Sequence, residues 1–268
     1  MLKLIGFPFD HNSSFLKGPA LAPAKIRMME TLGSANCFSE NGVEIVNGEN
    51  YQDVGDQTFE STDSALTFKT IKARVAKEIA DGSKLISLGG DHSVSFPIVD
   101  AFTEKYSGLN VIHFDAHPDL YDDFEGNAYS HASPFARLME RGKVKSLTQV
   151  GIRTFNTHQR DQAKRFNVSV IEMKDFSEER FQQVLSSLTG PLYISIDLDV
   201  LDPAFAPGIS HHEPGGMSTR QLLHCIQKIS VPIVGADIVE YNPTRDVNDV
   251  TAMVGYKIFK EIAARVLS

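Results

Sequence analysis

The chain has 268 residues, of which 42% are hydrophobic and 22% are charged. These proportions are typical of folded globular proteins and exclude an intrinsically disordered chain. Because a chain of this length buries most of its apolar surface, it needs no disulfides to fold. The 26 basic and 34 acidic side chains give a formal net charge of −8, which disfavours nucleic acid and membrane partners and is compatible with a small cationic substrate.

The cysteines and the N-terminal segment bear on the cellular compartment. Cys37 and Cys225 are the two cysteines, and without a C-x-x-C pair they indicate neither a disulfide scaffold nor a structural zinc site. The apolar N-terminal run is broken at Pro8 and Asp10, too early for the core of a signal peptide. No apolar run approaches the ~18 residues of a membrane helix. We therefore expect a cytoplasmic protein with reduced cysteines.

Short aliphatic and β-branched runs alternate with longer segments of helical period. This alternation predicts an α/β fold with a mostly parallel sheet covered by helices on both faces. No linker or repeat interrupts the pattern, so we expect one domain over residues 1–268. The predicted strands are Leu2 to Gly6, Leu85 to Leu88, Val111 to Phe114, Leu147 to Ile152, Val168 to Glu172, Leu192 to Ile196 and Ile233 to Ala236.

Three helices are predicted from their caps and apolar stripes. The first covers Asp63 to Ala80 and is followed by Gly82, a suitable left-handed cap. The second covers Ser218 to Ile229 and begins with a serine cap, and the third covers Thr251 to Val266. Their apolar stripes indicate packing against the sheet, so we expect the chemistry elsewhere.

Acidic and imidazole side chains follow four of the predicted strands. Ligands of open α/β sheets bind beyond the carboxyl ends of the strands, and alternate residues of an extended segment point to the same side. The segment Asp115-x-His117-x-Asp119 therefore presents three potential ligands together. The other groups are His92 after an earlier strand, Asp197 and Asp199 after a later one, and Asp237 and Glu240 after the last.

Six of these residues form a set of four carboxylates and two imidazoles without sulfur. Such a set favours manganese or a similar divalent ion, and two ions with bridging carboxylates would use all six ligands. A lone Asp or His at a strand end is more often a turn former or helix cap, which is the stronger interpretation of His92 alone. Three ionisable groups beside an apolar strand are costly without a cation, so the set predicts a two-metal site.

Several long strings resemble the ureohydrolase family of arginases, agmatinases and relatives, and are most similar to the plant-type arginases. The strings are HNSSFLKGP, GGDHSVSFP, FDAHPDLYDDFEGNAYSHASPF, SIDLDVLDPAFAPGISHHEPGG and DIVEYNPTRD. The resemblance spans nearly the whole chain. It implies a three-layer α/β/α arginase-like fold, two Mn²⁺ ions per chain and a homo-oligomer, either a trimer or a hexamer.

The resemblance also implies how the ligands are divided. One manganese would lie between His92, Asp115, Asp119 and Asp197, and the second between His117, Asp115, Asp197 and Asp199, so that Asp115 and Asp197 bridge the two ions.

Two further residues match functional positions of the family. Glu240 matches the glutamate that receives the guanidinium group, and His131 matches the histidine that handles protons. Both roles are chemically sound, since a carboxylate pairs with a guanidinium and histidine titrates near neutral pH. Without the motif context, a surface salt bridge for Glu240 and a polar loop position for His131 would be the simpler interpretations.

The implied reaction is hydrolysis of a guanidino substrate to urea and an amine. Arginase activity, from L-arginine to L-ornithine, is the leading hypothesis, and agmatinase or another guanidino or formimidoyl hydrolase is the alternative. A catalytically silent regulatory member of the family is the non-enzyme alternative, but such members typically lack metal ligands. No G-x-S-x-G or Walker A string indicates other chemistry.

Selectivity between these substrates is expected in the loops Asp122 to Ser130 and Arg153 to Asn156. Within the first loop, Asn127 and Ser130 are predicted to contact the tail of an amino-acid substrate. We interpret the adjacent His211 and His212 as part of an active-site loop and not as a further metal site, because neighbouring side chains diverge and six ligands are already assigned.

Overall fold

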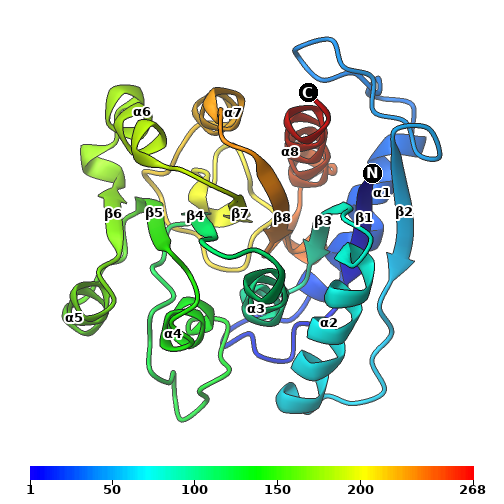
Figure 1. The fold of residues 1–268 in the computed structure, drawn as a ribbon. Helices are drawn as coiled ribbons and strands as arrows, with labels where there is room; N and C mark the ends of the chain where they lie inside the picture. Colours follow the sequence, from blue (N-terminus) through cyan, green and yellow to red (C-terminus); the bar gives the residue numbers. More distant parts are fainter.

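A parallel sheet of eight strands lies at the centre of the computed structural model, which describes residues 1–268 (Figure 1). Its strands are β1 (Leu2–Phe7), β2 (Tyr51–Asp56), β3 (Lys84–Gly89), β4 (Asn110–Phe114), β5 (Ser146–Ile152), β6 (Ser169–Glu172), β7 (Leu192–Asp197) and β8 (Ile233–Val239). Their order across the sheet is β2-β1-β3-β8-β7-β4-β5-β6, and every neighbouring pair is parallel.

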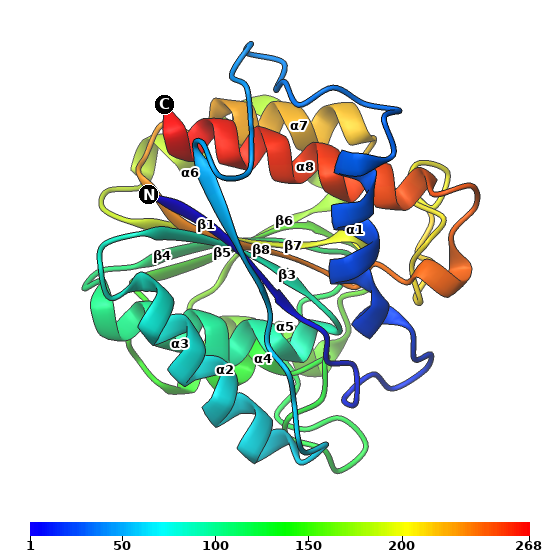
Figure 2. The ribbon, with the colours of Figure 1, turned by 90° about the vertical axis from the view of Figure 1, so that its right-hand side faces the viewer.

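Helices cover both faces of the sheet (Figure 2). One layer holds α1 (Ala22–Thr31), α6 (Glu178–Ser187), α7 (Thr219–Lys228) and α8 (Val250–Leu267), and the other holds α2 (Ser64–Ile79), α3 (Ser95–Lys105), α4 (Pro134–Glu140) and α5 (Thr157–Arg165). A separate hydrophobic cluster joins each layer to its face of the sheet. The predicted three-layer α/β/α arrangement is confirmed.

All seven predicted strands and the three predicted helices are present. The side chain of Asp63 caps α2 by accepting from the N–H of Leu66 at 2.8 Å, and Ser218 forms a reciprocal capping box with Gln221 at the start of α7. Strand β2 was not predicted, because Tyr51 is its one fully buried side chain and the rest of its sequence is mostly polar. It is an edge strand, stabilised by pairing with β1.

None of the helices combines the length and the apolar character needed to cross a membrane.

The strand order decides where the predicted ligands meet. Strands β3, β8, β7 and β4 are consecutive neighbours at the middle of the sheet, and they are the four strands whose following loops carry the predicted metal ligands and Glu240. Their carboxyl ends lie at one edge of the molecule, where the loops gather on the right of Figure 2. The sheet therefore brings segments from residues 90 to 240 into one site.

A tight contact between backbone segments closes this edge. The carbonyl oxygen of Phe9, just beyond β1, accepts a hydrogen bond from the N–H of Asp91 at 2.9 Å, and the carbonyl of Gly90 accepts one from the N–H of Glu240 at 2.9 Å. A Cβ on Gly90 would lie 1.9 Å from the oxygen of Phe9. Glycine is therefore required where β1, β3 and β8 end together.

We expect Gly90→Ala to lower the free energy of unfolding by about 3 kcal/mol or more, because the backbone it meets cannot rotate away. The matched control is Gly42→Ala. Gly42 has φ 77° and open space around its Cβ position, so its substitution reports a positive φ alone, at about 1 kcal/mol. Urea unfolding followed by circular dichroism measures both, and equal losses would contradict the steric argument.

Candidate active site

The imidazole of His92 faces three carboxylates at the carboxyl end of the central strands. Its Nδ1 lies 3.1 Å from Asp115 Oδ2, 3.0 Å from Asp119 Oδ2 and 3.2 Å from Asp197 Oδ2. All four residues are buried, yet Nδ1 makes no hydrogen bond. An unpaired ring nitrogen and three carboxylate oxygens that converge on it form the donor set of a cation site.

A second group shares one of these carboxylates. His117 Nδ1 lies 2.9 Å from Asp199 Oδ2 and 3.3 Å from Asp115 Oδ1. Asp115 thus turns one oxygen toward each group, as a bridging ligand does. The second oxygen of Asp197 instead accepts from the N–H of Asp199 at 2.8 Å, so the bridging role expected for Asp197 stays a prediction.

The ion pairs of the cluster are to the histidines His92, His113 and His117, and none is to a Lys or Arg. Burial raises the pKa of the Asp197 carboxyl well above its ordinary value, and the charges of Asp199 and Asp115 raise it further. The pKa of Asp199 is also raised, by burial and by the charge of Asp115. Carboxylates packed this closely away from water repel one another. A divalent cation offsets that repulsion, and the oxygen and nitrogen donors present fit a hard or borderline ion.

A hydrogen-bond chain behind His92 fixes its protonation. His92 Nε2 lies 3.1 Å from Ser195 Oγ, which donates to Asp237 Oδ1 at 2.6 Å. The other oxygen of Asp237 accepts from Tyr193 at 2.7 Å. Because Ser195 gives its proton to Asp237, its oxygen accepts one from His92 Nε2, which leaves the Nδ1 lone pair for a cation.

His113 is a functional residue that the sequence analysis missed. Its Nε2 lies 2.7 Å from Asp115 Oδ2, and its Nδ1 accepts from the amide of Gln149 at 3.0 Å. Since both ring nitrogens are engaged, His113 orients Asp115 and is not itself a free ligand. It is two residues before Asp115 on the same strand face, which is the signal that could have identified it.

Glu240 and His131 form a buried pair beside the cluster. Glu240 Oε1 accepts from the backbone N–H of His92 at 2.9 Å and from His131 Nδ1 at 2.9 Å. Burial lowers the pKa of His131, but the charge of Glu240 and the hydrogen bond to it outweigh burial and raise that pKa to about 9. Glu240 Oε2 is buried without a partner, and the residue has φ 62°. Such strain at a non-glycine residue is typical of functional sites.

A cavity of about 190 Å³ opens above these groups. Of the predicted site residues, His117, Asp119, His131, Asp197, Asp199 and Glu240 line it, while His92 and Asp115 are fully buried next to them. His211, which was predicted to belong to an active-site loop, also lines the cavity, whereas three lining residues were not predicted individually: Ser14, Phe124 and Ala132. Ser14 contacts His131 Nε2 through its hydroxyl at 2.9 Å and its N–H at 3.2 Å.

The structure does not bring Asn127 or Ser130 into this lining. Asn127 donates to Asn12 Oδ1 at 3.3 Å, and the hydroxyl of Ser130 accepts from the N–H of Ala132 at 3.2 Å. Both side chains serve to shape the loop that carries His131. Their assignment as substrate contacts therefore has no support in the shape of the cavity and stays a prediction.

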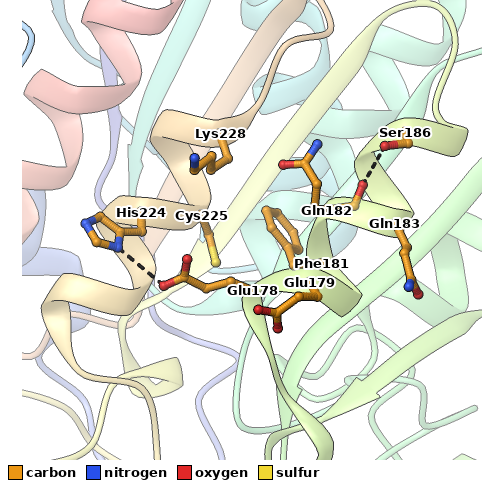
Figure 3. Close-up of a pocket in the computed structure, with 9 residues that line it drawn as sticks. All are labelled: Glu178, Glu179, Phe181, Gln182, Gln183, Ser186, His224, Cys225 and Lys228. Carbon is orange, nitrogen blue, oxygen red and sulfur yellow. Dashed lines mark hydrogen bonds and ion pairs between the residues drawn. The ribbon is translucent and has the colours of Figure 1, made fainter.

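A larger cavity of about 510 Å³ lies between α6 and α7, in one helical layer (Figure 3). Its one ionic contact joins His224 Nδ1 to Glu178 Oε1 at 3.4 Å. Burial raises the pKa of the Cys225 thiol to about 12, so this cysteine is not a nucleophile at neutral pH. The acidic and imidazole side chains that could bind a metal or a substrate line the smaller cavity at the strand ends.

The chain is similar to known proteins over nearly its whole length. The model of the arginase family matches residues 2–264. The chain is 46% identical to arginase 1, mitochondrial, of Arabidopsis thaliana, covering 98% of this chain and 80% of the relative. It is 33% identical to the agmatinase of Bacillus anthracis, covering 97% and 89%. The solved arginase from Medicago truncatula superposes with a TM-score of 0.90 at 43% identity, covering 99% and 87%.

Removing the hydroxyl behind His92 is expected to weaken cation binding without unfolding the protein. Ser195→Ala should raise the dissociation constant for Mn²⁺ roughly 10-fold or more, since the proton on His92 Nε2 loses its acceptor. The matched control is Ser87→Ala in β3, which is separated from β7 by β8 alone. Ser87 is buried and its hydroxyl has no partner. Calorimetric titration with Mn²⁺ measures both variants. Equal affinities would show that Ser195 does not orient His92.

Proposed function

Because this chain belongs to the arginase family, we propose that its pocket binds L-arginine and hydrolyses the guanidino group to give urea and L-ornithine. The observation that carries this proposal is the free oxygen of Glu240, buried without a partner in the cavity that also exposes the acid and imidazole cluster. A carboxylate oxygen in that position has the charge and the acceptor capacity to receive a guanidinium group.

We further propose two Mn²⁺ ions per chain. His92, Asp119, Asp115 and Asp197 would hold one ion, and His117, Asp199, Asp115 and Asp197 the other. When bound, the two ions supply the Lewis-acid chemistry that makes a nucleophile from water at neutral pH. Such a nucleophile is required, because a guanidinium carbon is a poor electrophile whose positive charge is spread over three nitrogens.

Glu240 binds and orients the substrate in this proposal. A guanidinium is planar and presents only N–H donors, and Glu240 offers one fully free oxygen, since its other oxygen already accepts from His92 N–H and His131. These two bonds hold the carboxylate rigidly. Substrate binding therefore costs little ordering of the side chain.

His131 holds the proton that the leaving amine requires. Its pKa, raised to about 9, favours the protonated imidazole at neutral pH, in which Nδ1–H donates to Glu240 and Nε2–H faces the hydroxyl of Ser14 in place of accepting from its N–H. Its position in the cavity lining lets it reach a substrate nitrogen. Collapse of the tetrahedral intermediate breaks the bond from carbon to the alkylated nitrogen. His131 donates its proton to that nitrogen as it leaves, so the amine departs neutral. The hydroxyl proton of the intermediate is given up as the carbonyl of urea forms, which yields neutral urea and replaces the proton that His131 gave.

Agmatine is the second candidate substrate, and one observation favours it. The cavity lining contains no lysine or arginine, so no fully charged cation there pairs with the α-carboxylate that distinguishes arginine from agmatine. The higher identity to the Arabidopsis arginase than to the Bacillus agmatinase supports arginine. A catalytically silent role is disfavoured, because all six predicted ligands, His131 and Glu240 are in place.

Oligomer formation and location are separate parts of the proposal. The trimer or hexamer implied by the family resemblance stays a prediction. The cytoplasmic location also stays a prediction, since the Arabidopsis relative is named as mitochondrial.

Urea release after loading with Mn²⁺ tests the proposed function. The panel contains arginine, agmatine, guanidinobutyrate, guanidinopropionate and guanidine, with formamide release from formimidoylglutamate assayed separately. We expect the highest kcat/KM for arginine. A preference for agmatine would replace arginine by the second candidate, and no release from any compound would contradict the proposal.

Substitutions of Glu240 and His131 are expected to change different kinetic parameters. Glu240→Gln should raise KM roughly 10-fold or more for every guanidino substrate, because an amide lacks the charge and one acceptor oxygen. His131→Ala should instead lower kcat by roughly 10² to 10⁴, the usual share of a general acid. Steady-state kinetics with metal content measured on the same samples checks both. Asp197→Ala is the contrasting variant that should lose metal, and loss of metal from His131→Ala would refute its assigned role.

A further inference from the structure

His211 is a polar residue of the cavity for which the proposed mechanism has no use. Outside the metal cluster, the polar lining residues are Ser14, His131, His211 and Glu240. Both ring nitrogens of His131 are engaged, by Glu240 and by Ser14. Glu240 Oε2 is buried without a partner. No hydrogen bond is made by the side chain of His211 either, so both residues bring an unpaired acceptor to the lining of the cavity.

The ring of His211 is held by its neighbours on three sides. Its centroid lies 5.2 Å from that of His131, 5.6 Å from that of Phe15 and 6.0 Å from that of His117. Phe15 is itself 67% exposed, so it contacts the imidazole of His211 from the solvent side of the loop and does not belong to the core. Burial lowers the pKa of His211 below its ordinary value, although the charges of Glu240 and Asp199 oppose this effect, while those of His131 and His117 add to it.

The backbone around His211 is fixed from both sides. On one side, Ser210 Oγ accepts from Asn242 Nδ2 at 2.9 Å. On the other side, Arg153 donates to the carbonyl of Glu213 through Nε at 2.9 Å and Nη2 at 2.6 Å, and the same Nη2 donates to the carbonyl of Asp199 at 2.6 Å. Arg153 therefore ties the His211 loop directly to the backbone of a predicted metal ligand. An imidazole held this way is preorganised toward the cavity.

We propose that His211 is a substrate-binding residue that accepts a hydrogen bond from a guanidinium N–H, as a second acceptor beside Glu240 Oε2. This inference rests on the proposed function, because it takes a guanidino compound as the ligand. The chemistry is complementary: a guanidinium offers five N–H donors and no acceptor, and a neutral imidazole offers a lone pair. Two acceptors from different loops fix the plane of the group, which one carboxylate oxygen does not.

The proposed contact involves the guanidinium end of the substrate and not its tail. His211 is expected to act on the guanidinium and not on the α-amino or α-carboxylate group. Its removal should therefore weaken arginine and agmatine equally. L-Ornithine, which carries the tail without the guanidinium, should bind as before.

The test compares His211→Ala with His212→Ala. The adjacent His212 is exposed and its Nε2 lies 2.9 Å from the carbonyl of Pro207, so it is a matched control on the same loop. We expect His211→Ala to raise KM for arginine and agmatine roughly 10-fold, the loss of a hydrogen bond to a charged group. His212→Ala should change neither KM, and His211→Asn, which restores a neutral acceptor, should recover part of the loss. Metal content is measured for each variant.

Two kinetic outcomes would overturn the inference. One is a KM for His211→Ala within twofold of that for His212→Ala. The other is an inhibition constant for L-ornithine that rises as much as KM for arginine, which would place His211 against the tail of the substrate.

Equilibrium binding separates this inference from the proposed function. Calorimetry with arginine is performed on protein kept in chelator, where no turnover occurs. If His211→Ala binds arginine more weakly than His212→Ala does, but the parent enzyme releases no urea, the role of His211 is supported and the proposed hydrolysis is contradicted. Turnover by the parent enzyme with equal binding by both variants would contradict the inference alone, and absence of both turnover and binding in the parent would contradict both.

Discussion

Mutual repulsion among four buried carboxylates is the constraint on which the rest of this structure depends. Asp115, Asp119, Asp197 and Asp199 lie at the carboxyl ends of two adjacent central strands, with His92 and His117 between them. Carboxylates packed this closely away from water repel one another, and a bound cation would offset that repulsion. Two hydrogen-bond chains orient the cluster: one runs from His92 through Ser195 to Asp237, and the other from Asp115 through His113 to Gln149.

The fold and the ligand set could be predicted from sequence because each rests on local patterns. Buried parallel strands are short apolar runs, and their carboxyl ends are where ligands bind, so Asp115, His117 and Asp119 could be recognised as convergent from their alternation alone. Strand order could not be predicted, since it depends on contacts between distant segments. It is this order, β3-β8-β7-β4, that brings His92 and Glu240 beside the other residues.

The walls of the cavity were harder to predict for the same reason. Ser14 and His211 contact His131 from loops that are far apart in the chain. The conformation of the loop that carries His211 depends on hydrogen bonds from Arg153 to backbone carbonyls. No local pattern encodes such contacts. Asn127 illustrates the converse: it is close to His131 in sequence, but its side chain turns to Asn12.

The most direct test of the two-metal site is a crystal structure of the Mn²⁺-loaded protein with an anomalous difference map. We expect two peaks about 3.5 to 4 Å apart, one contacting His92 and Asp119, the other contacting His117 and Asp199, with Asp115 contacting both. A single peak, or peaks away from these residues, would contradict it.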